Sequence, residues 1–299
     1  MLQSKWRVKK IDLGIIMNKI SSHSLILGGE KTLSKISQTP RLDSELLLAD
    51  VLNVDRVQFY YKDVFPKKQQ IQTYESLLKK RMEGMPIAYL TGYKEFWSLP
   101  LKVNQDTLIP RPETEHLVQQ SLVKLYNLNK NYRVLELGTG CGAAAIAIAS
   151  ERPLAKIIAT DISTKALKMG KYNASNLKIS NIQFVCSDWF NGISDHKFDL
   201  IISNPPYVDA KKIKDYKPTS LSHEPRVALF ADNHGISCIK EIIKESIKFL
   251  KKHSWLIIEH AHDQSAICKQ LMQSSQFKEI YTTLDYSGLG RITEGQKSD

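Results

Sequence analysis

The sequence has few cysteines, no long apolar run and no repeated or low-complexity segment. Its four cysteines, at positions 141, 186, 238 and 268, lack the paired spacing of a disulfide framework or a zinc site, so we expect a reducing, cytoplasmic environment. The longest uncharged apolar stretch, LGTGCGAAAIAIAS, is too short and too rich in glycine to cross a bilayer. We therefore expect neither disulfides nor a membrane partner.

The 299-residue chain carries a net charge of +11, with 42% hydrophobic and 24% charged residues, which is the composition of an ordinary globular protein. No run reaches five like charges, so we expect the short basic clusters to be solvated faces, although the basic excess is modestly concentrated in the N-terminal third. A basic surface favours an acidic partner, but the sequence contains no recognisable RNA- or DNA-binding module. We therefore expect a monomer that does not require direct contact with nucleic acid.

The first third of the chain is predicted to be helical. PRLDSELLLADVLN places apolar residues at helical spacing after Pro40, and KKQQIQTYESLLKKRMEG repeats the pattern up to Gly84, where a C-cap would stand. We interpret residues 1–85 as a small helical domain that recognises a substrate. Residues 86–110 contain YKEFWSLPLKV, which is typical of a hairpin-like connector.

Residues 111–299 are predicted to form an α/β domain. Its first helix is opened by Pro112, and the charged residues Arg111, Glu113 and Glu115 there face either a substrate or the helix dipole. Beyond it, short apolar strands alternate with helices, which is typical of a doubly wound, largely parallel sheet. The predicted fold class is therefore α/β, a Rossmann-like domain preceded by a small α-helical domain.

A glycine-rich turn, within VLELGTGCGAAAIAIA, follows the first strand of this domain. Gly138, Gly140 and Gly142 allow the backbone to approach a ligand at the carboxyl end of the strand, where open sheets bind ligands. Their G-x-G-x-G spacing differs from the dinucleotide fingerprint, and the Lys and Ser or Thr of a nucleotide-phosphate loop are missing. A tight strand-to-helix turn without a ligand is the alternative.

The next two strands end in residues suited to a nucleoside. Asp161 comes roughly 20 residues beyond the glycine turn, where a carboxylate can accept both hydroxyls of a ribose. Trp189 follows the third strand and is well placed to meet an adenine. The alternatives are a helix N-cap for Asp161 and a plain core position for Trp189.

The fourth strand stops at Asn204, and Pro205, Pro206 and Tyr207 follow. The carbonyl oxygens of the Asn204 side chain and the Pro205 backbone could hold both hydrogens of a planar –NH2 group and aim its nitrogen at a methyl donor. Pro206 restricts Pro205 and donates no hydrogen bond, so the second acceptor stays free, and Tyr207 can lie against a planar substrate. The residues predict catalysis by orientation, against the alternative of an ordinary Asn-Pro turn.

This order of motifs resembles the S-adenosylmethionine-dependent methyltransferases of the Rossmann-like class. Together with GMPIAYLTGYKEFWSLPLKV, LIPRPETEHLV, HEPRVALFA and LIIEH, it makes the chain from about Pro40 to Thr293 similar to the peptide chain release factor glutamine methyltransferases, the PrmC/HemK family. The resemblance implies methyl transfer from S-adenosyl-L-methionine to the side-chain nitrogen of the glutamine in the Gly-Gly-Gln motif of class I release factors. It also implies that the helical N-terminal domain grips the release factor.

The resemblance further implies roles for single residues. The implied cofactor contacts are Gly138, Thr139, Gly140, Cys141, Gly142, Asp161, Trp189 and Asn204. The implied substrate clamp is Asn204, Pro205, Pro206 and Tyr207, of which Asn204, Pro205 and Tyr207 would be catalytic. Three features depart from the family pattern, namely Cys141 in place of a small hydroxyl residue, the loose closing segment DYSGLGRIT and the residues before Met17, which have no counterpart in it.

Other functions stay open on the residues alone. An N-methyltransferase acting on an exocyclic amine of adenine or guanine in DNA or RNA would use the same clamp. A non-catalytic protein that binds the cofactor is another class, although the intact clamp argues against it. His260, His262 and Asp263 lie close together in IIEHAHD, but we expect a surface cluster and no metal there.

Overall fold

A computed structural model describes residues 20–194, 197–209, 211 and 220–298. The chain forms two compact units, one reaching to Thr91 and the other beginning at Gly92. The division therefore falls inside the segment 86–110 that the sequence marks as a connector. The first 19 residues of the predicted N-terminal domain lie outside the described residues. No helix in the described part of the chain is both long and apolar enough to span a membrane.

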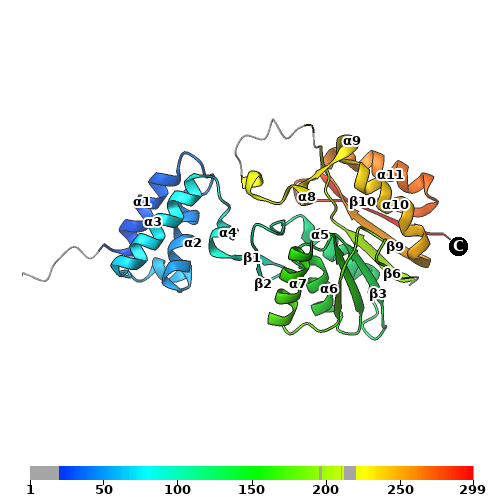
Figure 1. Ribbon diagram of the computed structural model, residues 1–299, viewed down its shortest axis with the longest axis horizontal. Coiled ribbons are helices and arrows are strands. Elements are labelled where there is room, and N and C mark those ends of the chain that lie inside the picture. The colour runs from blue at the N-terminus through cyan, green and yellow to red at the C-terminus, as the bar shows by residue number, and fades with distance from the viewer. Residues whose placement is uncertain (1–19, 195–196, 210, 212–219, 299) are drawn as a thin grey trace, which may run out of the picture. The chain divides into compact units, whose positions relative to one another are not determined.

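The N-terminal unit is helical, as predicted (Figure 1). The two helices predicted around residues 40–53 and 67–84 are confirmed, and Gly84, with φ of 92°, directly follows the end of the second. The sequence analysis did not identify the first helix, which contains two adjacent glycines that disfavour a helix. The elements are α1 (Ser22–Leu33), α2 (Pro40–Leu52), the 3-10 helix η1 (Arg56–Tyr60), α3 (Lys68–Met82) and α4 (Ile87–Thr91).

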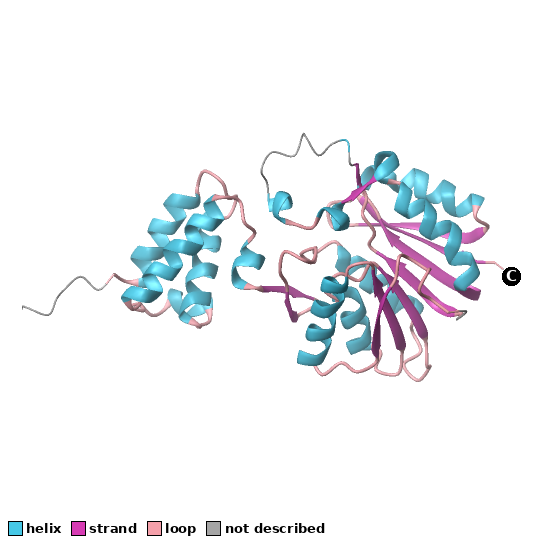
Figure 2. Ribbon diagram, in the orientation of Figure 1, coloured by secondary structure: helices cyan, strands magenta, loops and turns pink. Residues whose placement is uncertain are grey.

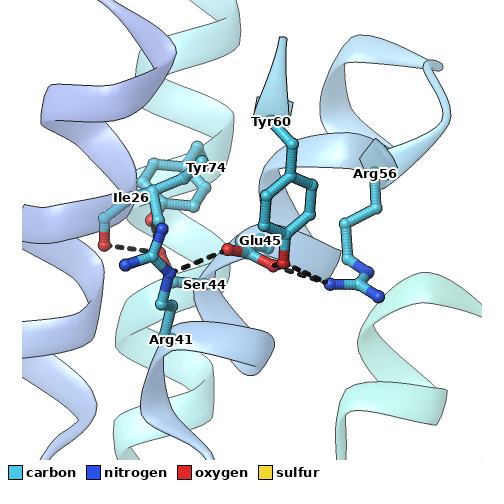
Figure 3. Close-up of polar contacts among 7 residues, drawn as sticks. All are labelled: Ile26, Arg41, Ser44, Glu45, Arg56, Tyr60 and Tyr74. Atoms are coloured by element: carbon cyan, nitrogen blue, oxygen red, sulfur yellow. Dashed lines mark hydrogen bonds and ion pairs between the residues drawn. The ribbon is translucent and has the colours of Figure 1, made fainter. Parts of the chain in front are cut away.

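Hydrogen bonds to two neighbouring residues of α2 tie this unit together (Figure 3). The Ser44 hydroxyl donates to the carbonyl of Ile26 at 2.9 Å and lies 2.6 Å from the Tyr74 hydroxyl, so it links α1 to α3. The Glu45 carboxylate accepts hydrogen bonds from side chains of α2 and η1. Although burial raises the pKa of Glu45, the hydrogen bonds from Arg56, Arg41 and Tyr60 hold it below its usual value.

The second unit opens with the predicted hairpin, β1 (Tyr93–Phe96) and β2 (Leu99–Lys102), which pair antiparallel (Figure 2). It continues into a seven-stranded sheet of order β10-β11-β9-β6-β3-β4-β5. Only β11 runs against its neighbours, so the sheet is largely parallel, as predicted. The strands are β3 (Arg133–Leu137), β4 (Lys156–Asp161), β5 (Ile182–Cys186), β6 (Phe198–Ser203), β9 (Leu250–Glu259), β10 (Phe277–Leu284) and β11 (Gly290–Lys297).

Helices cover both faces of this sheet (Figure 1). α5, α6 and α7 lie on one face, and α10 and α11 lie on the other, where they build a hydrophobic core with apolar residues of β3, β6 and β9. The helix predicted to open at Pro112 begins two residues later, because Pro112 belongs to the turn before it. The helices are α5 (Thr114–Lys124), α6 (Ala143–Glu151), α7 (Thr164–Asn176), α10 (Ser237–Phe249) and α11 (Ser265–Ser274).

The strand order fixes where a ligand can bind. β3 has β4 on one side and β6 on the other, and all three are parallel. A crevice therefore opens between the carboxyl ends of β3 and β6, where the direction of the strand order reverses. The glycine turn follows β3 and Asn204 follows β6, so both motifs reach this crevice.

The two glycines of α1 provide a matched stability test. A Cβ on Gly29 would lie 2.1 Å from the Tyr74 hydroxyl and 2.4 Å from the Ser44 hydroxyl, whereas a Cβ on Gly28 would meet nothing within 4 Å. We expect Gly29→Ala to destabilise the N-terminal unit by about 1–3 kcal/mol through overpacking. Gly28→Ala should stabilise it by about 0.5–1 kcal/mol, because alanine favours a helix. Urea unfolding followed by circular dichroism at the helical band measures both, and equal effects would contradict the packing seen around Ser44.

Candidate active site

A cavity of about 280 Å³ lies in the second unit at the carboxyl edge of the sheet. Gly138 and Gly140 from the turn after β3, Asp161 from the end of β4, Trp189 from beyond β5 and Asn204 from beyond β6 all line it. Pro206 lines it as well. The structure therefore brings together residues from all four motifs that the sequence analysis identified, although they span almost 70 positions of the chain.

The glycine turn has a backbone that only glycine adopts without strain. The φ angles of Gly138, Gly140 and Gly142 are 73°, 57° and 84°. A Cβ on Gly138 would lie 3.7 Å from the Trp189 ring and 4.0 Å from the Asn204 carbonyl oxygen, so the turn, the indole and the clamp meet at this point. The turn therefore presents bare backbone to the cavity.

A buried carboxyl group supports the turn from beneath. Glu136, on β3, accepts hydrogen bonds from the Thr139 hydroxyl and from the Ala145 N–H at the start of α6. Burial raises the pKa of Glu136 to about 8, against the hydrogen bonds from Thr139 and Ala145, which lower it. The Thr139 hydroxyl is thus occupied by its hydrogen bond to Glu136. Cys141 is buried, and burial raises the pKa of its thiol to about 12. Neither they nor Gly142 line the cavity.

Asp161 is tied to the glycine turn. Its two carboxylate oxygens accept the N–H groups of Gly140 and Ser163, each at 2.8 Å. The helix that follows is capped by Ser163, whose hydroxyl accepts the N–H of Ala166, so Asp161 is not its N-cap. Each carboxylate oxygen keeps a free lone pair beside the cavity, and burial raises the pKa of the group.

Trp189 both lines the cavity and packs against the core. Its backbone φ is 45°, in the left-handed region that residues other than glycine rarely adopt. Its ring packs on the hydrophobic core that includes Phe190 and Ile201. The two interpretations of Trp189, ligand contact and core position, are therefore compatible.

In the Asn-Pro-Pro-Tyr segment, the side-chain oxygen of Asn204 is the polar atom that a ligand can reach. The side-chain Nδ2 of Asn204 donates to the Thr114 hydroxyl at 3.1 Å, which leaves Oδ1 as the acceptor on the other side of the amide. Pro205 is buried and does not line the cavity. Tyr207 does not line it either, because its hydroxyl donates to Glu259 Oε1 at 3.2 Å. Burial raises the pKa of Tyr207, so its hydroxyl stays protonated.

Two residues that the sequence analysis missed, Gln264 and Gly235, contact this segment. Gln264 donates its amide hydrogens to the backbone carbonyls of Tyr207, at 3.0 Å, and His234, at 3.2 Å. Gly235, with φ of 82°, packs so closely that a Cβ would lie 2.0 Å from the Tyr207 carbonyl oxygen. Neither contact has a local sequence signal, because Gln264 and Gly235 lie far from residue 207 along the chain.

A third missed residue, Glu224, joins two stretches of the cavity wall. Residues 106–108 and 225–230 both contribute to the lining. The Glu224 side chain between them is buried and accepts hydrogen bonds from the Ile109 N–H, at 3.0 Å, and from the Arg111 guanidinium. Arg111 therefore pairs with an acidic residue of the HEPR segment. The sequence signal for this pair was the presence of an acidic residue and an arginine in two separate segments close to the motifs.

The histidine cluster of IIEHAHD is only partly at the surface. His262 and Asp263 are exposed, but His260 is fully buried, so the expected surface cluster is wrong for His260. β11 pairs with the end of β9 and covers it, and Nε2 of His260 bonds to the Thr293 hydroxyl at 2.8 Å. Among the described residues, no three His, Cys, Asp or Glu side chains are grouped as a metal site requires.

Comparisons with known families match both units. Residues 128–296 match the family model described as a methyltransferase domain, and residues 24–92 match that of the PrmC N-terminal domain. A release factor glutamine methyltransferase of Coxiella burnetii is 44% identical over 261 residues, which is 87% of this chain and 93% of that protein. The Escherichia coli protein of the same name is 39% identical over 261 residues, with the same coverage.

Solved structures share the fold of the second unit (residues 92–299, hereafter the catalytic unit). A methyltransferase from Pyrococcus furiosus has a TM-score of 0.50 and 16% identity, covering 67% of this chain and 90% of that one. The hMettl16 catalytic domain in complex with the MAT2A 3'UTR hairpin 6 has a TM-score of 0.56 and 14% identity, covering 80% and 85%. At these identities the likeness concerns the fold alone.

The buried Glu136 makes a prediction about stability and pH. Because its pKa is raised from 4.5 to about 8 in the folded chain, the native state holds a proton that the unfolded state releases between these values. Stability of the catalytic unit should therefore fall as pH rises from about 5 to 8, by up to about 1.4 kcal/mol per pH unit for this group. Glu136→Gln, which cannot ionise, should show a shallower fall.

Urea unfolding followed by tryptophan fluorescence measures this effect, because Trp97, Trp189 and Trp255 all belong to the catalytic unit. The free energies of unfolding at pH 5.5, 6.5 and 7.5 give the slope for each protein. Equal slopes in the wild type and in Glu136→Gln would contradict the assignment to Glu136.

Proposed function

Because the chain belongs to the release factor glutamine methyltransferase family, we propose that it methylates the side-chain amide nitrogen of a glutamine in a peptide chain release factor, with S-adenosyl-L-methionine as methyl donor. The chain is a protein-(glutamine-N5) methyltransferase that serves translation termination. We place the target at the glutamine of the Gly-Gly-Gln motif. The N-terminal unit, which matches the PrmC N-terminal domain, is proposed to grip the release factor.

The orientation of the Asn204 amide is the observation that carries this proposal. Thr114 accepts its N–H, so Oδ1 is the atom left to accept a hydrogen from a substrate. A glutamine –NH2 has two hydrogens to donate, and we propose that the backbone carbonyl of Pro205, a buried residue outside the cavity lining, accepts the second one. An amide nitrogen is a poor nucleophile because its lone pair is delocalised. Fixing both hydrogens points that lone pair in one direction, and such orientation is worth up to about 7–11 kcal/mol in well-arranged systems.

The cavity residues fit S-adenosyl-L-methionine, which when bound supplies an electrophilic methyl group. We propose that the backbone of Gly138 and Gly140 passes close to it, since neither glycine has a Cβ to obstruct the approach. The free lone pairs of Asp161 suit the two ribose hydroxyls, and the Trp189 ring suits the adenine. The contribution of Thr139, Cys141 and Gly142 would be limited to shaping the turn.

The transfer itself needs no general base in its first step. The N–C bond forms as the S–C bond breaks, and the electron pair of the broken bond stays on sulfur. At that stage the nitrogen carries the methyl group, both hydrogens and a positive charge, and this N-protonated amide, which is a strong acid, then releases one proton to water. Asn204 and Pro205 can therefore hold both hydrogens until the methyl group has moved.

Asp161 provides a test of the cofactor site with a control at the opposite edge of the sheet. Asp161→Ala should weaken the affinity for S-adenosyl-L-methionine by about 10- to 100-fold, since hydrogen bonds to a charged group are worth about 1.5–3 kcal/mol. Asp199, which accepts the Arg133 N–H at 2.8 Å near the start of β6, is the matched carboxylate. Asp199→Ala should leave the affinity unchanged within about threefold. Isothermal titration calorimetry measures both, and equal losses would refute the ribose contact.

Transfer of labelled methyl groups tests the substrate. The protein is incubated with labelled S-adenosyl-L-methionine and, in separate reactions, a class I release factor, its Gly-Gly-Ala variant, total RNA and DNA. We expect label in the release factor alone, and not in the variant. Label in nucleic acid but not in the release factor would overturn the substrate and favour the exocyclic amine.

The same assay tests the clamp. Asn204→Ala should lower turnover at least about 100-fold, because the amide nitrogen loses its orientation, while cofactor affinity changes only a few-fold. Asn181 is the control, as its amide donates to three backbone carbonyls near the opposite edge of the sheet. Asn181→Ala should reduce stability but keep turnover per folded molecule. An Asn204→Ala protein with normal turnover would refute the clamp.

A further inference from the structure

Both polar side chains of the Asn-Pro-Pro-Tyr segment are held by residues that do not line the cavity. Asn204 Nδ2 donates to Thr114, in the first turn of α5, at 3.1 Å. The Tyr207 hydroxyl donates to Glu259, the last residue of β9, at 3.2 Å. Thr114 and Glu259 thus each hold one polar side chain of the clamp by a hydrogen bond, although the two residues are far apart in the sequence.

Glu259 is buried with one oxygen unsatisfied. The residue is 1% exposed, and among the described residues its Oε2 atom has no hydrogen-bond partner. A buried carboxylate oxygen without a donor is costly, so a nearby hydroxyl gains by turning its proton toward it. The Thr114 hydroxyl accepts from Asn204 and still has its own proton to donate. It also favours the ionised form of Glu259.

The direction of the Thr114 hydroxyl decides which end of the Asn204 amide faces the cavity. If this hydroxyl donates to Glu259, it can only accept from the amide, so the –NH2 end of Asn204 points to Thr114 and Oδ1 points to the substrate. If Thr114 is free to donate to Asn204 instead, the amide can turn over. Its –NH2 would then face the –NH2 of the substrate, and two donors cannot bind each other.

We propose that Thr114 and Glu259 are positioning residues for methyl transfer: ionised Glu259 fixes the direction of the Thr114 hydroxyl, and Thr114 fixes the amide of Asn204 with its acceptor toward the substrate. This inference rests on the proposed function. It also predicts that protonation of Glu259 weakens the clamp, because the acid must then donate a hydrogen bond of its own to Thr114 or Tyr207.

Several charged groups act on Glu259. Burial raises its pKa to about 7, the Thr114 and Tyr207 hydroxyls lower it, Glu113 raises it and Arg291 lowers it. Arg111 and Arg291 act to lower the pKa of Tyr207, because their positive charges favour its anion. The adjacent His260 has a lowered pKa because it is buried. Glu259 therefore changes charge close to neutral pH.

The test compares Glu259→Gln with Glu294→Gln. Glu294, on β11, is also buried with an unsatisfied Oε2, but it pairs with Lys124 away from the cavity. Turnover of the release factor is measured from pH 5.5 to 9 at saturating substrates, with the KM for the release factor and the Kd for S-adenosyl-L-methionine. Fold is checked by circular dichroism for each protein.

In the wild type we expect turnover to fall as pH drops through about 7, as Glu259 takes up a proton. Glu259→Gln should lower kcat about tenfold at pH 8 and remove this step, with KM and Kd within about threefold, because the group acts through Asn204 and not on binding. Glu294→Gln should keep the wild-type profile. A Glu259→Gln protein with normal kcat, or with the step retained, would overturn the inference.

Thr114 gives a second test if Glu259→Gln does not fold. Thr114→Val removes the hydroxyl at nearly constant volume and should lower kcat about tenfold, whereas Thr114→Ser keeps the hydroxyl and should restore most of the activity. Equal kcat values for wild type and Thr114→Val would overturn the inference. Failure of the wild type to methylate any release factor would instead refute the proposed function, and this inference with it.

Discussion

The parallel pairing of β4, β3 and β6 determines where the functional segments of the catalytic unit lie. Because these strands run side by side in one direction, their carboxyl ends meet at one edge of the sheet. The turn after β3 and Asn204 each begin directly beyond a strand, and Asp161 is the last residue of β4. Backbone groups and short side chains there are free to bind a ligand.

Three acids contribute hydrogen bonds at this edge of the sheet; Glu136 and Glu259 are buried, and Asp161 is partly buried. Glu136 and Asp161 accept backbone N–H groups on two sides of the glycine turn, so they fix its shape. Glu259 accepts a hydrogen bond from the Tyr207 hydroxyl, and its other oxygen has no partner within the described part of the chain. Burial raises the pKa of all three, to about 8 for Glu136 and to about 7 for Glu259. The unsatisfied oxygen distinguishes Glu259 as the acid with a further hydrogen bond to accept.

The sequence alone predicted the part of the site that consists of residues at the ends of strands. Gly138, Asp161, Trp189 and Asn204 follow apolar strands, and a parallel sheet must bring such positions together, so the local pattern was sufficient. The same reasoning predicted the hairpin and the largely parallel sheet. It placed the start of α5 two residues early, since a proline in the turn before a helix and one in its first turn look alike in sequence.

The other part of the site consists of residues whose partners are distant in sequence. Thr114 meets Asn204 across 90 positions, and Glu224 meets Ile109 across 115. Nothing local marks either as functional, and His260 was misjudged for the same reason, because the strand that covers it is formed more than 30 residues later. Only the register of distant elements reveals these contacts.

These distant partners matter because an amide is a two-ended group. Asn204 can present a donor or an acceptor from nearly the same position, so its identity in the sequence does not determine its chemistry. The hydroxyl of Thr114 is equally able to donate or accept. A carboxylate can only accept, and placing one behind the two removes the ambiguity from both. In the proposed mechanism, the charge of Glu259 therefore fixes the acceptor end of Asn204 toward the substrate without contacting the substrate itself.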